Sequence, residues 1–300
     1  MVCKECSGVN TLLDIIISGL TVGALYAVGT VALSVLWGNL GMLNMAHGAM
    51  LGIGGYSSYV LVNSFDLPWW LGLPCGMAGG LVVGLLLYYL IVRWMFEKPE
   101  FTLNIIIATI GVALLFESLT VNFFGGQGQK QPFIFEGFIR LGKSTLPHQT
   151  LVIIGASVVL MLIVGGILRR TNMGLVIRAS AQDRAAASLM GVPTRKVMAQ
   201  VMALAGVVTA VSGVMVTSLT TLHPSVGHDP MLRALIFCCV AGLGNINGAV
   251  YVAFALGLFE MTIQYTVAAQ FGLPTVLGLV ILLLIWRPEG LFGHARVSHS

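Results

Sequence analysis

The feature that most constrains this chain is a series of long apolar runs. Four of them carry no charged residue and reach or exceed the ~18 residues that predict a membrane-spanning helix: 15–36, 68–92, 150–168 and 197–222. Three more are as long, but each contains an ionisable residue: 43–62, 101–124 and 246–269. Two shorter runs, 231–243 and 274–286, are candidates for broken or partial spans.

The length of these runs predicts an all-α integral membrane protein. Strands of a membrane barrel hold only about 9 to 11 alternating residues, so we expect a polytopic helical bundle with about eight or nine spans, some of them broken. Only 9% of the residues are charged, against roughly 25% in a soluble domain. We therefore expect one transmembrane domain over residues 1–300. Its first run is too long for the core of a cleavable signal peptide and is expected to remain as a span.

Basic residues predict the orientation of the bundle. The most charged stretch lies between 168 and 197, and the positive-inside rule places it in the cytoplasm. With nine crossings, the basic residues expected inside are Arg169, Arg170, Arg178, Arg184, Arg195, Lys196, Arg93, Lys98, Arg287 and Arg296. Those expected outside are Lys4, Lys130, Arg140, Lys143 and Arg233. The N-terminus is then external, the C-terminus internal, and residues 125–149 form an external loop.

Residues 137–144 match the phosphate-binding P-loop pattern G-x-x-x-x-G-K-[ST] letter for letter, with the sequence GFIRLGKS. One span separates this segment from the cytoplasmic loop, which places Lys143 outside the cell, where there is no ATP. Pro147 also argues against the helix that must follow a P-loop. Residues 131–141, QPFIFEGFIRL, nearly alternate in polarity, so we interpret them as a small external hairpin.

The cytoplasmic loop, about 169–196, contains a short predicted helix. Ser180 to Asp183 form a start similar to a capping box, Arg184 to Met190 favour helix, and Gly191 followed by Pro193 is a stop signal. A helix of two to three turns is too short to be stable alone, so another surface must pack on it. That surface is either the bilayer and the bundle itself, or a partner subunit. The residues predicted to dock such a partner are Ser180, Asp183, Arg184, Ala186, Ala187, Leu189 and Gly191.

These residues carry a resemblance to a known family. Ala185-Ala186-Ala187-x-x-x-Gly191 resembles the coupling loop of ABC importer permeases, with Ala185 in place of the usual glutamate. Further motifs, in order across residues 19–293, are similar to permeases of branched-chain amino-acid importers: Asn44-Met45-Ala46-His47-Gly48, Met173-Gly174-x-x-x-Arg178-Ala179-x-Ala181-Gln182-Asp183, Gly242-x-Gly244-x-x-x-Gly248-Ala249 and Arg287-Pro288-x-Gly290-Leu291-Phe292. Arg233 and its neighbouring cysteines depart from the family pattern, which leaves the substrate open.

The resemblance implies a pore subunit of a bacterial inner-membrane importer that works by alternating access and is not itself an enzyme. It implies a second related permease, two cytoplasmic ATPases that use ATP and Mg, and a periplasmic binding protein that delivers substrate. The chain itself is expected to hold no cofactor and no metal. The substrate implied is a branched-chain or other apolar amino acid, with urea or a short amide as the alternative.

Polar residues inside apolar runs are candidates for the translocation path, because they are costly in a membrane. Asn44 and His47 lie one helical turn apart beside Gly48, and they either line the path or satisfy backbone groups at a helix break. Glu117 and Glu260 lie within long runs, and Arg233 is a possible partner for one of them. Gly242, Gly244 and Asn245 interrupt a second run, which suggests two breaks in separate halves, as in transporters built from repeats.

Two interpretations of another kind stay open at this point. A proton-coupled secondary transporter or channel would use Glu117 or Glu260 as proton carrier. His223, His228 and Asp229 cluster before Pro230 in a predicted external loop, where they could bind a metal but more simply contact another protein or solvent. Cys3 and Cys6 have no second ligand pair beside them for a zinc site.

Overall fold

The structure is a computed structural model that describes residues 2–65, 68–96, 98, 100–131, 137–141 and 144–293. The long helices are α1 (Val2–Leu40), α3 (Gly72–Leu87), α5 (Phe101–Phe124), α6 (His148–Arg170), α9 (Thr194–Leu219), α11 (Ile246–Thr266) and α12 (Gly272–Trp286). Shorter ones are α2 (His47–Ser64), α4 (Arg93–Met95), α7 (Asn172–Gln182), α8 (Arg184–Leu189) and α10 (His228–Ala241). A π-helical turn, Tyr88–Val92, joins α3 to α4. Short 3-10 turns, Trp69–Leu71 and Ala269–Phe271, precede α3 and α12.

In the described part of the chain, seven helical segments are long and apolar enough to cross a membrane: Thr11–Leu40, Gly72–Met95, Phe101–Phe124, His148–Arg170, Thr194–Leu219, Ile246–Thr266 and Ala269–Trp286. The prediction of an all-α polytopic bundle is confirmed. The run 274–286, expected as a partial span, belongs to a full-length one. The run 231–243 corresponds to α10, whose 14 residues are too few to span a bilayer as a helix.

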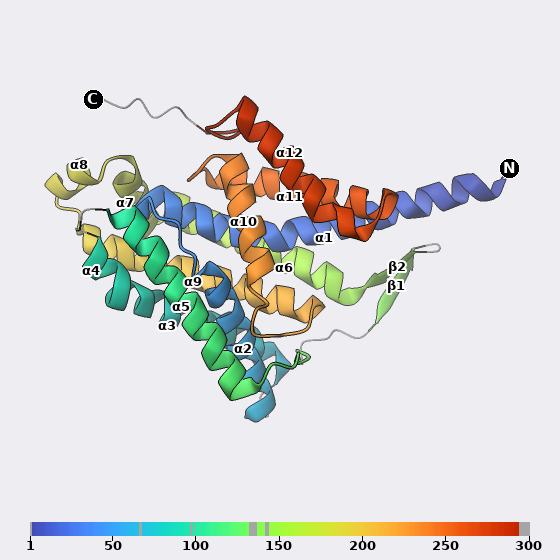
Figure 1. The fold of residues 1–300 in the computed structure, drawn as a ribbon, viewed down its shortest axis with the longest axis horizontal. Coiled ribbons are helices and arrows are strands. Elements are labelled where there is room, and N and C mark those ends of the chain that lie inside the picture. The colour runs from blue at the N-terminus through green and yellow to red at the C-terminus, as the bar shows by residue number, and fades with distance from the viewer. Residues whose placement is uncertain are drawn as a thin grey trace.

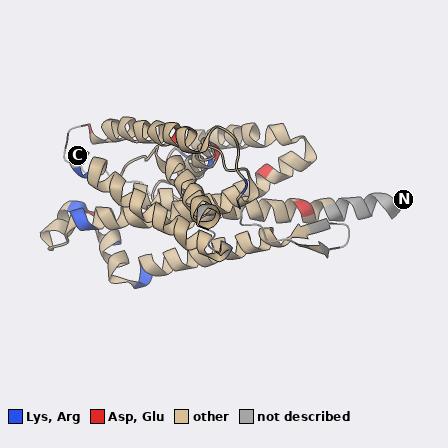
Figure 2. Ribbon diagram, turned by 90° about the horizontal axis from the view of Figure 1, so that it is seen from below, with Lys and Arg blue, Asp and Glu red and all other residues tan. Residues whose placement is uncertain are grey.

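Contacts between distant segments define two ends of the molecule. At one end, here called the α8 end, Arg184 bonds to Asn39 O, Arg169 bonds to Asn247, and Gly244 packs on Gly38. At the other, here called the hairpin end, Gln129 pairs with Leu222 and Ser18 lies by Tyr265. Lys and Arg residues gather at the α8 end, on the left in Figure 2. α1 runs across the molecule between the two ends (Figure 1).

Two crossings combine an irregular segment with a short helix. After α1 ends at the α8 end, residues 41–46 turn back into the interior, and α2 continues to the hairpin end. After α9 ends at the hairpin end, residues 220–227 enter the interior, and α10 continues to the α8 end. The two entering segments meet where Gly48 lies against Gly227. Irregular backbone at membrane depth is tolerated where protein buries it. These two segments would add two broken crossings to the seven candidate spans.

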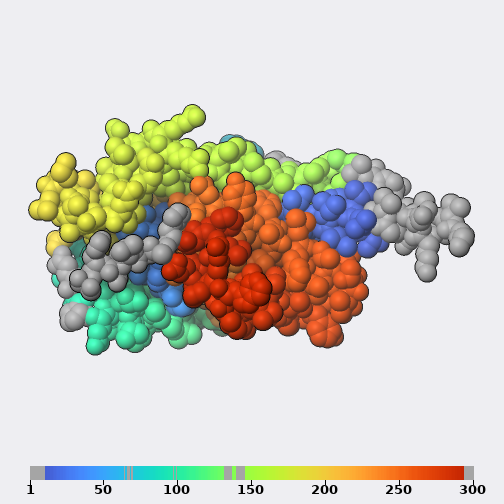
Figure 3. Space-filling view, turned by 90° about the horizontal axis from the view of Figure 1, so that it is seen from above, coloured from blue at the N-terminus to red at the C-terminus, as the bar shows by residue number. Residues whose placement is uncertain are grey.

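The two halves of the core pack in corresponding ways. α1 packs along α11, and α3 packs along α9, while α2 lies against α9 and α10 lies against α1. Because α1, α2 and α3 run in directions opposite to α9, α10 and α11, the arrangement is that of an inverted repeat. α12 and α11 occupy the middle of the face shown in Figure 3, beside α6 and α7.

Small residues hold these helices close together. Gly76, Gly80 and Gly84 of α3 face Val214, Gly206 and Met202 of α9. A Cβ at Gly80 would overlap the Gly206 carbonyl oxygen, so only glycine fits there. Gly19 and Gly23 of α1 face Leu258 and Phe254 of α11 in the same manner. Spacing of small residues by four is the usual basis of close helix packing in membranes.

The segment with the P-loop pattern is a hairpin, as the sequence analysis predicts. β1 (Phe138–Leu141) pairs antiparallel with β2 (Ser144–Pro147), and α6 begins only at His148. The first strand falls within residues 131–141, where the hairpin was predicted, whereas the second strand begins at Ser144, beyond that stretch. Lys143 lies outside the described residues.

Candidate functional site

Asn44 and His47 stand at the first break. The Asn44 side-chain oxygen accepts a hydrogen bond from Ala46 N at 3.0 Å, and His47 N donates to Asn44 O at 3.2 Å. Asn44 Nδ2 lies 3.4 Å from Met50 Sδ. Both polar side chains are buried. Asn44 thus satisfies backbone groups of the turn that precedes α2, which is the structural role weighed for it above.

The hydrogen bonds of His47 define which ring nitrogen carries the proton. His47 Nδ1 lies 3.3 Å from Thr209 Oγ1, and the Thr209 hydroxyl donates to Ala205 O at 2.7 Å. The Thr209 oxygen is therefore left to accept, and His47 Nδ1 is the donor. Among the described residues His47 Nε2 has no partner, so it presents a lone pair to the protein interior.

Gly48 connects the two breaks. A Cβ on Gly48 would lie 2.7 Å from Gly227 O, so the backbones of the two entering segments touch. α2 and α10 begin with the same pattern, His-x-x-Met-Leu, at His47 and at His228. No sequence repeat was evident at the outset, because three shared residues in a chain of 300 carry little weight without the geometry.

Glu117 and His228 form a pair on the surface between α5 and α10. His228 Nε2 lies 3.6 Å from Glu117 Oε2, and the two side chains are 54% and 32% exposed, respectively. His228 is the first residue of α10, whereas the sequence analysis placed it in an external loop. Hydrocarbon cannot solvate a partly exposed carboxylate, so this surface faces water or another protein.

Glu260 is paired with Arg233, which confirms one of the two partnerships considered from the sequence. The Arg233 guanidinium forms an ion pair and hydrogen bond with Glu260 Oε1, which also accepts from Gln264 Nε2 at 3.1 Å. The guanidinium carbon lies 5.0 Å from the centre of the Tyr26 ring. The pair therefore ties α10 to α11 and α1. Arg233 was expected on the external side near the start of the short run 231–243, and it lies within α10 with its side chain largely buried.

Gly242, Gly244 and Asn245 lie in the turn between α10 and α11. Gly242 and Gly244 have φ angles of +92° and +91°, which glycine adopts readily. Asn245 caps α11 by accepting from Gly248 N at 3.0 Å, and its amide donates to Phe292 O at 3.0 Å. This turn packs on Gly38 at the α8 end. The segment that corresponds to 41–46 in the arrangement of the helices is 220–227, whereas 242–248 form the turn between α10 and α11.

The predicted docking helix lies at the α8 end and is shorter than expected. α8 has six residues, and Asp183 caps it by accepting from Ala186 N at 3.0 Å. Ser180 was predicted to start this helix, but it is buried within α7, which the sequence analysis did not separate from the loop. Gly191 follows the helix with φ +83°, as its role as a stop signal requires.

The docking residues divide into those that anchor α8 and those that it exposes. Arg184 donates to Asn39 O at 2.5 Å, and its guanidinium lies 4.3 Å from the centre of the Phe96 ring. Burial lowers the pKa of Arg184, although a guanidinium stays charged at any physiological pH. Ala187 is buried, whereas Ala186 is exposed. Leu189 and Met190 are 88% and 85% exposed, so the tip of this element carries two large apolar side chains with no cover.

Comparison with known proteins decides the family. The family described as branched-chain amino acid transport system, permease component, matches residues 15–286. The chain belongs to this permease family. With the seven apolar helices, it is therefore a multi-pass protein of the inner membrane.

Two relatives of the permease match nearly the whole chain, and a third matches about three quarters of it. The high-affinity branched-chain amino acid transport system permease protein LivH of Escherichia coli is 25% identical, covering 94% of this chain and 95% of its own. The corresponding BraD of Pseudomonas aeruginosa is 23% identical, covering 94% and 96%. The L-arabinose ABC transporter permease protein AraH of Azospirillum brasilense is 25% identical, covering 74% and 63%.

The residues predicted for the translocation path of the permease lie in four separate places. Asn44, His47 and Gly48 meet Gly227 in the interior, Glu117 meets His228 on a surface, Glu260 meets Arg233 between helices, and Gly242 to Asn245 pack at the α8 end. Sequence reasoning missed Gly227, Thr209 and Gln264; the repeated His-x-x-Met-Leu pattern was the one signal that could have indicated Gly227. Within the described residues, no group of three or more His, Cys, Asp or Glu could hold a metal ion.

Proposed function

We propose that this chain is the permease subunit of an ATP-binding-cassette importer that moves branched-chain or other apolar amino acids inward by alternating access. The observation that carries the proposal is α8: a capped, anchored element with two exposed apolar side chains at the end of the bundle where basic residues gather. The relatives covering 94% of the chain are named for branched-chain amino acid transport. The relative named for L-arabinose covers less of it.

ATP and Mg would be used by two cytoplasmic ATPases, one of which would dock on the exposed tip formed by Ala186, Leu189 and Met190. Arg184 would transmit the motion, because it binds the last turn of α1 through Asn39 O. α1 in turn leads directly into the first break. A ligand or partner shifts such an equilibrium only by binding one state better than the other, so the ATPase must contact this tip differently in its two nucleotide states.

The surface with Glu117 and His228 is our candidate for the translocation path and for the contact with a second permease subunit. It is the place where a carboxylate and an imidazole at membrane depth are both partly exposed. Asn44, His47 and Gly48 lie behind it at the break and would act as a gate. In this proposal Glu260 supports the packing of the helices, and Gly242, Gly244 and Asn245 support the α8 end.

Uptake measurements test this function. The chain would be reconstituted in vesicles with its ATPases, its second permease and its binding protein, and uptake of leucine would be compared with uptake of urea, a short amide and arabinose. We expect ATP-dependent uptake of leucine that needs the binding protein. Uptake by this chain alone that an uncoupler abolishes would contradict the proposal and indicate a proton-coupled transporter.

Replacing Leu189 with aspartate tests the docking element. Leu189→Asp should abolish co-purification of the ATPase and ATP-dependent uptake, because it places a charge on an apolar contact. Leu243 is the matched control, since it is also an exposed leucine at the α8 end but not on α8. Loss of the ATPase from Leu243→Asp and not from Leu189→Asp would place the docking site elsewhere.

A further inference from the structure

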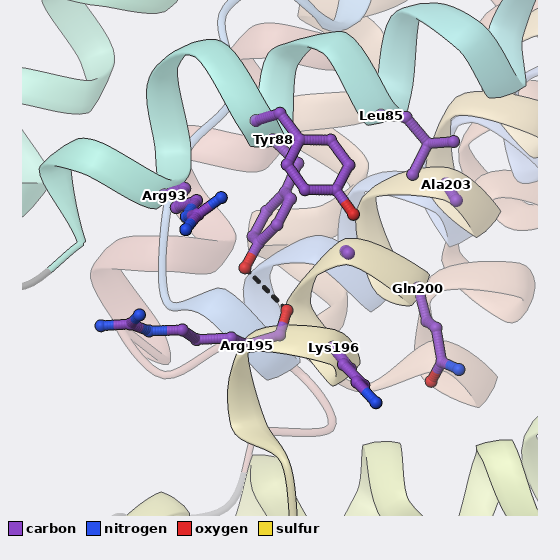
Figure 4. Close-up of a pocket in the computed structure, with 9 residues that line it drawn as sticks. Leu85, Tyr88, Arg93, Arg195, Lys196, Gln200 and Ala203 are labelled. Carbon is purple, nitrogen blue, oxygen red and sulfur yellow. Dashed lines mark hydrogen bonds between the residues drawn. The ribbon is translucent and has the colours of Figure 1, made fainter.

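Two cavities open at the α8 end, and their basic side chains are arranged differently. The first, of about 530 Å³, lies between the π-helical turn and the start of α9. The Tyr88 hydroxyl joins its walls by donating to Arg195 O at 2.7 Å, and the Arg195 and Lys196 side chains point apart (Figure 4). These two cations therefore do not converge on one ligand. The second cavity, of about 480 Å³, is a groove between α6 and α11 with two arginines at the end of one wall.

Three helices form this groove. α6 lies beside α11 on the face shown in Figure 3, and Val31 of α1 lies between them in the lining. The polar end of the groove consists of Asn247 of α11 together with Arg169 and Arg170, the last two residues of α6. The rest of the lining is apolar: Met161, Leu162, Val164, Gly165, Gly166, Ile246 and Val250. The groove is thus an apolar channel with one cationic end.

The structure holds the Arg169 guanidinium at that end. Its Nη2 donates to Asn247 Oδ1 at 2.7 Å, and this bond links α6 to α11. The bond uses one of five N–H donors, and the Asn247 amide is neutral, so it does not cancel the charge of Arg169. Arg170 is exposed and forms no hydrogen bond or ion pair with the part of the chain that the structure describes. No Asp or Glu is among the described residues that line the groove.

The start of α11 adds to the positive potential. Ile246 and Asn247 are the first two residues of this helix, and both line the groove. The N-terminus of a helix of 21 residues carries a partial positive charge. The two guanidinium groups and this terminus therefore favour an anion at the same end of the groove.

Gly165 and Gly166 leave an open strip along the apolar part. A Cβ at either position would meet nothing within 4 Å, whereas a Cβ at Gly80 of α3 would overlap a neighbouring helix. Packing within the chain therefore does not require glycine at 165 or 166, although glycine within a helix is destabilising relative to alanine. The missing side chains give an elongated apolar molecule room to lie against α6.

The groove opens toward lipid. The side chains of α6 next to it are large, apolar and exposed: Val158, Val159, Leu162 and Ile163. On α11, Tyr251 is also exposed, and such aromatic side chains collect at the membrane–water interface. Because α6 is a candidate span that ends at Arg170, its two arginines lie where the lipid headgroups begin.

We infer that the groove between α6 and α11 binds an anionic phospholipid, with its phosphate at Arg169 and Arg170 and an acyl chain against the strip of Gly165 and Gly166. Basic pockets between membrane helices bind anionic headgroups in this way. The inference does not depend on the proposed transport function. It gives a role to two glycines and one arginine whose presence the contacts within the described chain do not explain.

The test is a titration of the purified full-length chain with phosphatidylglycerol and, separately, with phosphatidylcholine of the same acyl chains, followed by native mass spectrometry. We expect phosphatidylglycerol to bind more tightly. The double variant Arg169→Gln and Arg170→Gln should lose affinity for it by roughly 25-fold, since each basic residue near an anionic surface contributes about a factor of five. Gly166→Leu fills the groove without a change of charge and should also weaken binding.

Matched controls leave the groove intact. Lys98→Gln with Arg178→Gln removes the same charge from the α8 end, at two exposed residues outside the lining. Gly155→Leu adds the same side chain to α6 at another glycine whose Cβ would meet nothing within 4 Å. Both controls should keep the affinity and the preference for phosphatidylglycerol. Should the double arginine variant fail to fold, Arg170→Gln alone should lower the affinity about fivefold.

Three results would overturn the inference. One is equal binding of the two lipids to the unaltered chain, or a preference that survives in the groove variants. Another is displacement of the lipid by an equal concentration of glycerol 3-phosphate, because the apolar groove would then contribute nothing. The third is a co-purifying membrane protein that Gly166→Leu releases while the lipid preference persists, because another helix would then occupy the groove.

Discussion

At the scale of residues, Glu260 is the buried carboxylate whose charge must be compensated. A lone carboxylate in hydrocarbon is costly, and the structure meets that cost with the Arg233 guanidinium, the Gln264 amide and the Tyr26 ring. Arg233 and Glu260 are 27 positions apart in the sequence. The sequence alone does not give the distance between their side chains. Glu117, with a similar place in an apolar run, has a different environment on a surface.

Breaking the buried pair should destabilise the protein more than removing it. Arg233→Met leaves the Glu260 carboxylate uncompensated, and we expect a loss of about 3–5 kcal/mol. The double variant Arg233→Met and Glu260→Met should recover most of that loss, because no charge is left behind. Thermal unfolding in detergent measures both. If the double variant were as unstable as the single one, the ion pair would not be the cause of the loss.

Replacing Glu117 distinguishes a path residue from a lipid-facing one. Glu117→Leu should leave the amount of assembled protein unchanged and lower ATP-dependent uptake by about tenfold or more, equivalent to roughly 1.4 kcal/mol. Uptake should fall because, in this proposal, the Glu117 carboxylate faces water or the partner subunit. Leu114→Glu, at an exposed position on the same helix, serves as the comparison. Full uptake by Glu117→Leu would exclude Glu117 from the path.

At the scale of elements, the close packing of the helices depends on the positions that glycine occupies. Most long helices could be predicted, since ~18 apolar residues in a row leave few alternatives. The two broken crossings could be predicted only in part. Asn44 to Gly48 suggested a break and the short run 231–243 suggested a broken span, but neither run gives a sign that residues 220–227 enter the interior. What decides them is the tertiary contact of Gly48 with Gly227.

A large side chain at a helix crossing should separate α3 from α9. Gly80→Leu places atoms on the Gly206 carbonyl oxygen and the Ala210 side chain, and we expect destabilisation of about 1–3 kcal/mol or more. Gly111→Leu on α5 is the control, because a Cβ there meets nothing within 4 Å. Detergent unfolding curves compare the two. Equal stability of both variants would show that the α3–α9 contact is looser than the structure indicates.

Removing the anchor of α8 should uncouple the docking element from the bundle. Arg184→Ala deletes the bond to Asn39 O and the contact with Phe96 but leaves Leu189 and Met190 in place. We expect the ATPase still to co-purify while uptake per ATP hydrolysed falls. Simultaneous measurement of hydrolysis and uptake in vesicles gives this ratio. An unchanged ratio would mean that motion reaches α1 by another route.

At the scale of the whole molecule, the fold follows from the inverted arrangement of two similar halves. The orientation stays a prediction from the basic residues, which gather at the α8 end and so place that end in the cytoplasm (Figure 2). Of the candidate site, the short helix α8 was located because caps and stops are local signals, as Asp183 and Gly191 show. The interior site was located only in part, because His47 was visible in an apolar run whereas its partner Thr209 looks like any other helix residue.

The central claim is that α8 faces the cytoplasm as the docking element of an importer permease. Its most direct test is sidedness, with Leu189→Cys and, separately, Gln127→Cys in a chain whose five native cysteines are replaced. A membrane-impermeant thiol reagent is applied to intact cells and then to permeabilised ones. The account predicts labelling of residue 127 in intact cells and of residue 189 only after permeabilisation. Labelling of residue 189 in intact cells, with residue 127 protected, would invert the protein and remove α8 from the reach of any ATPase.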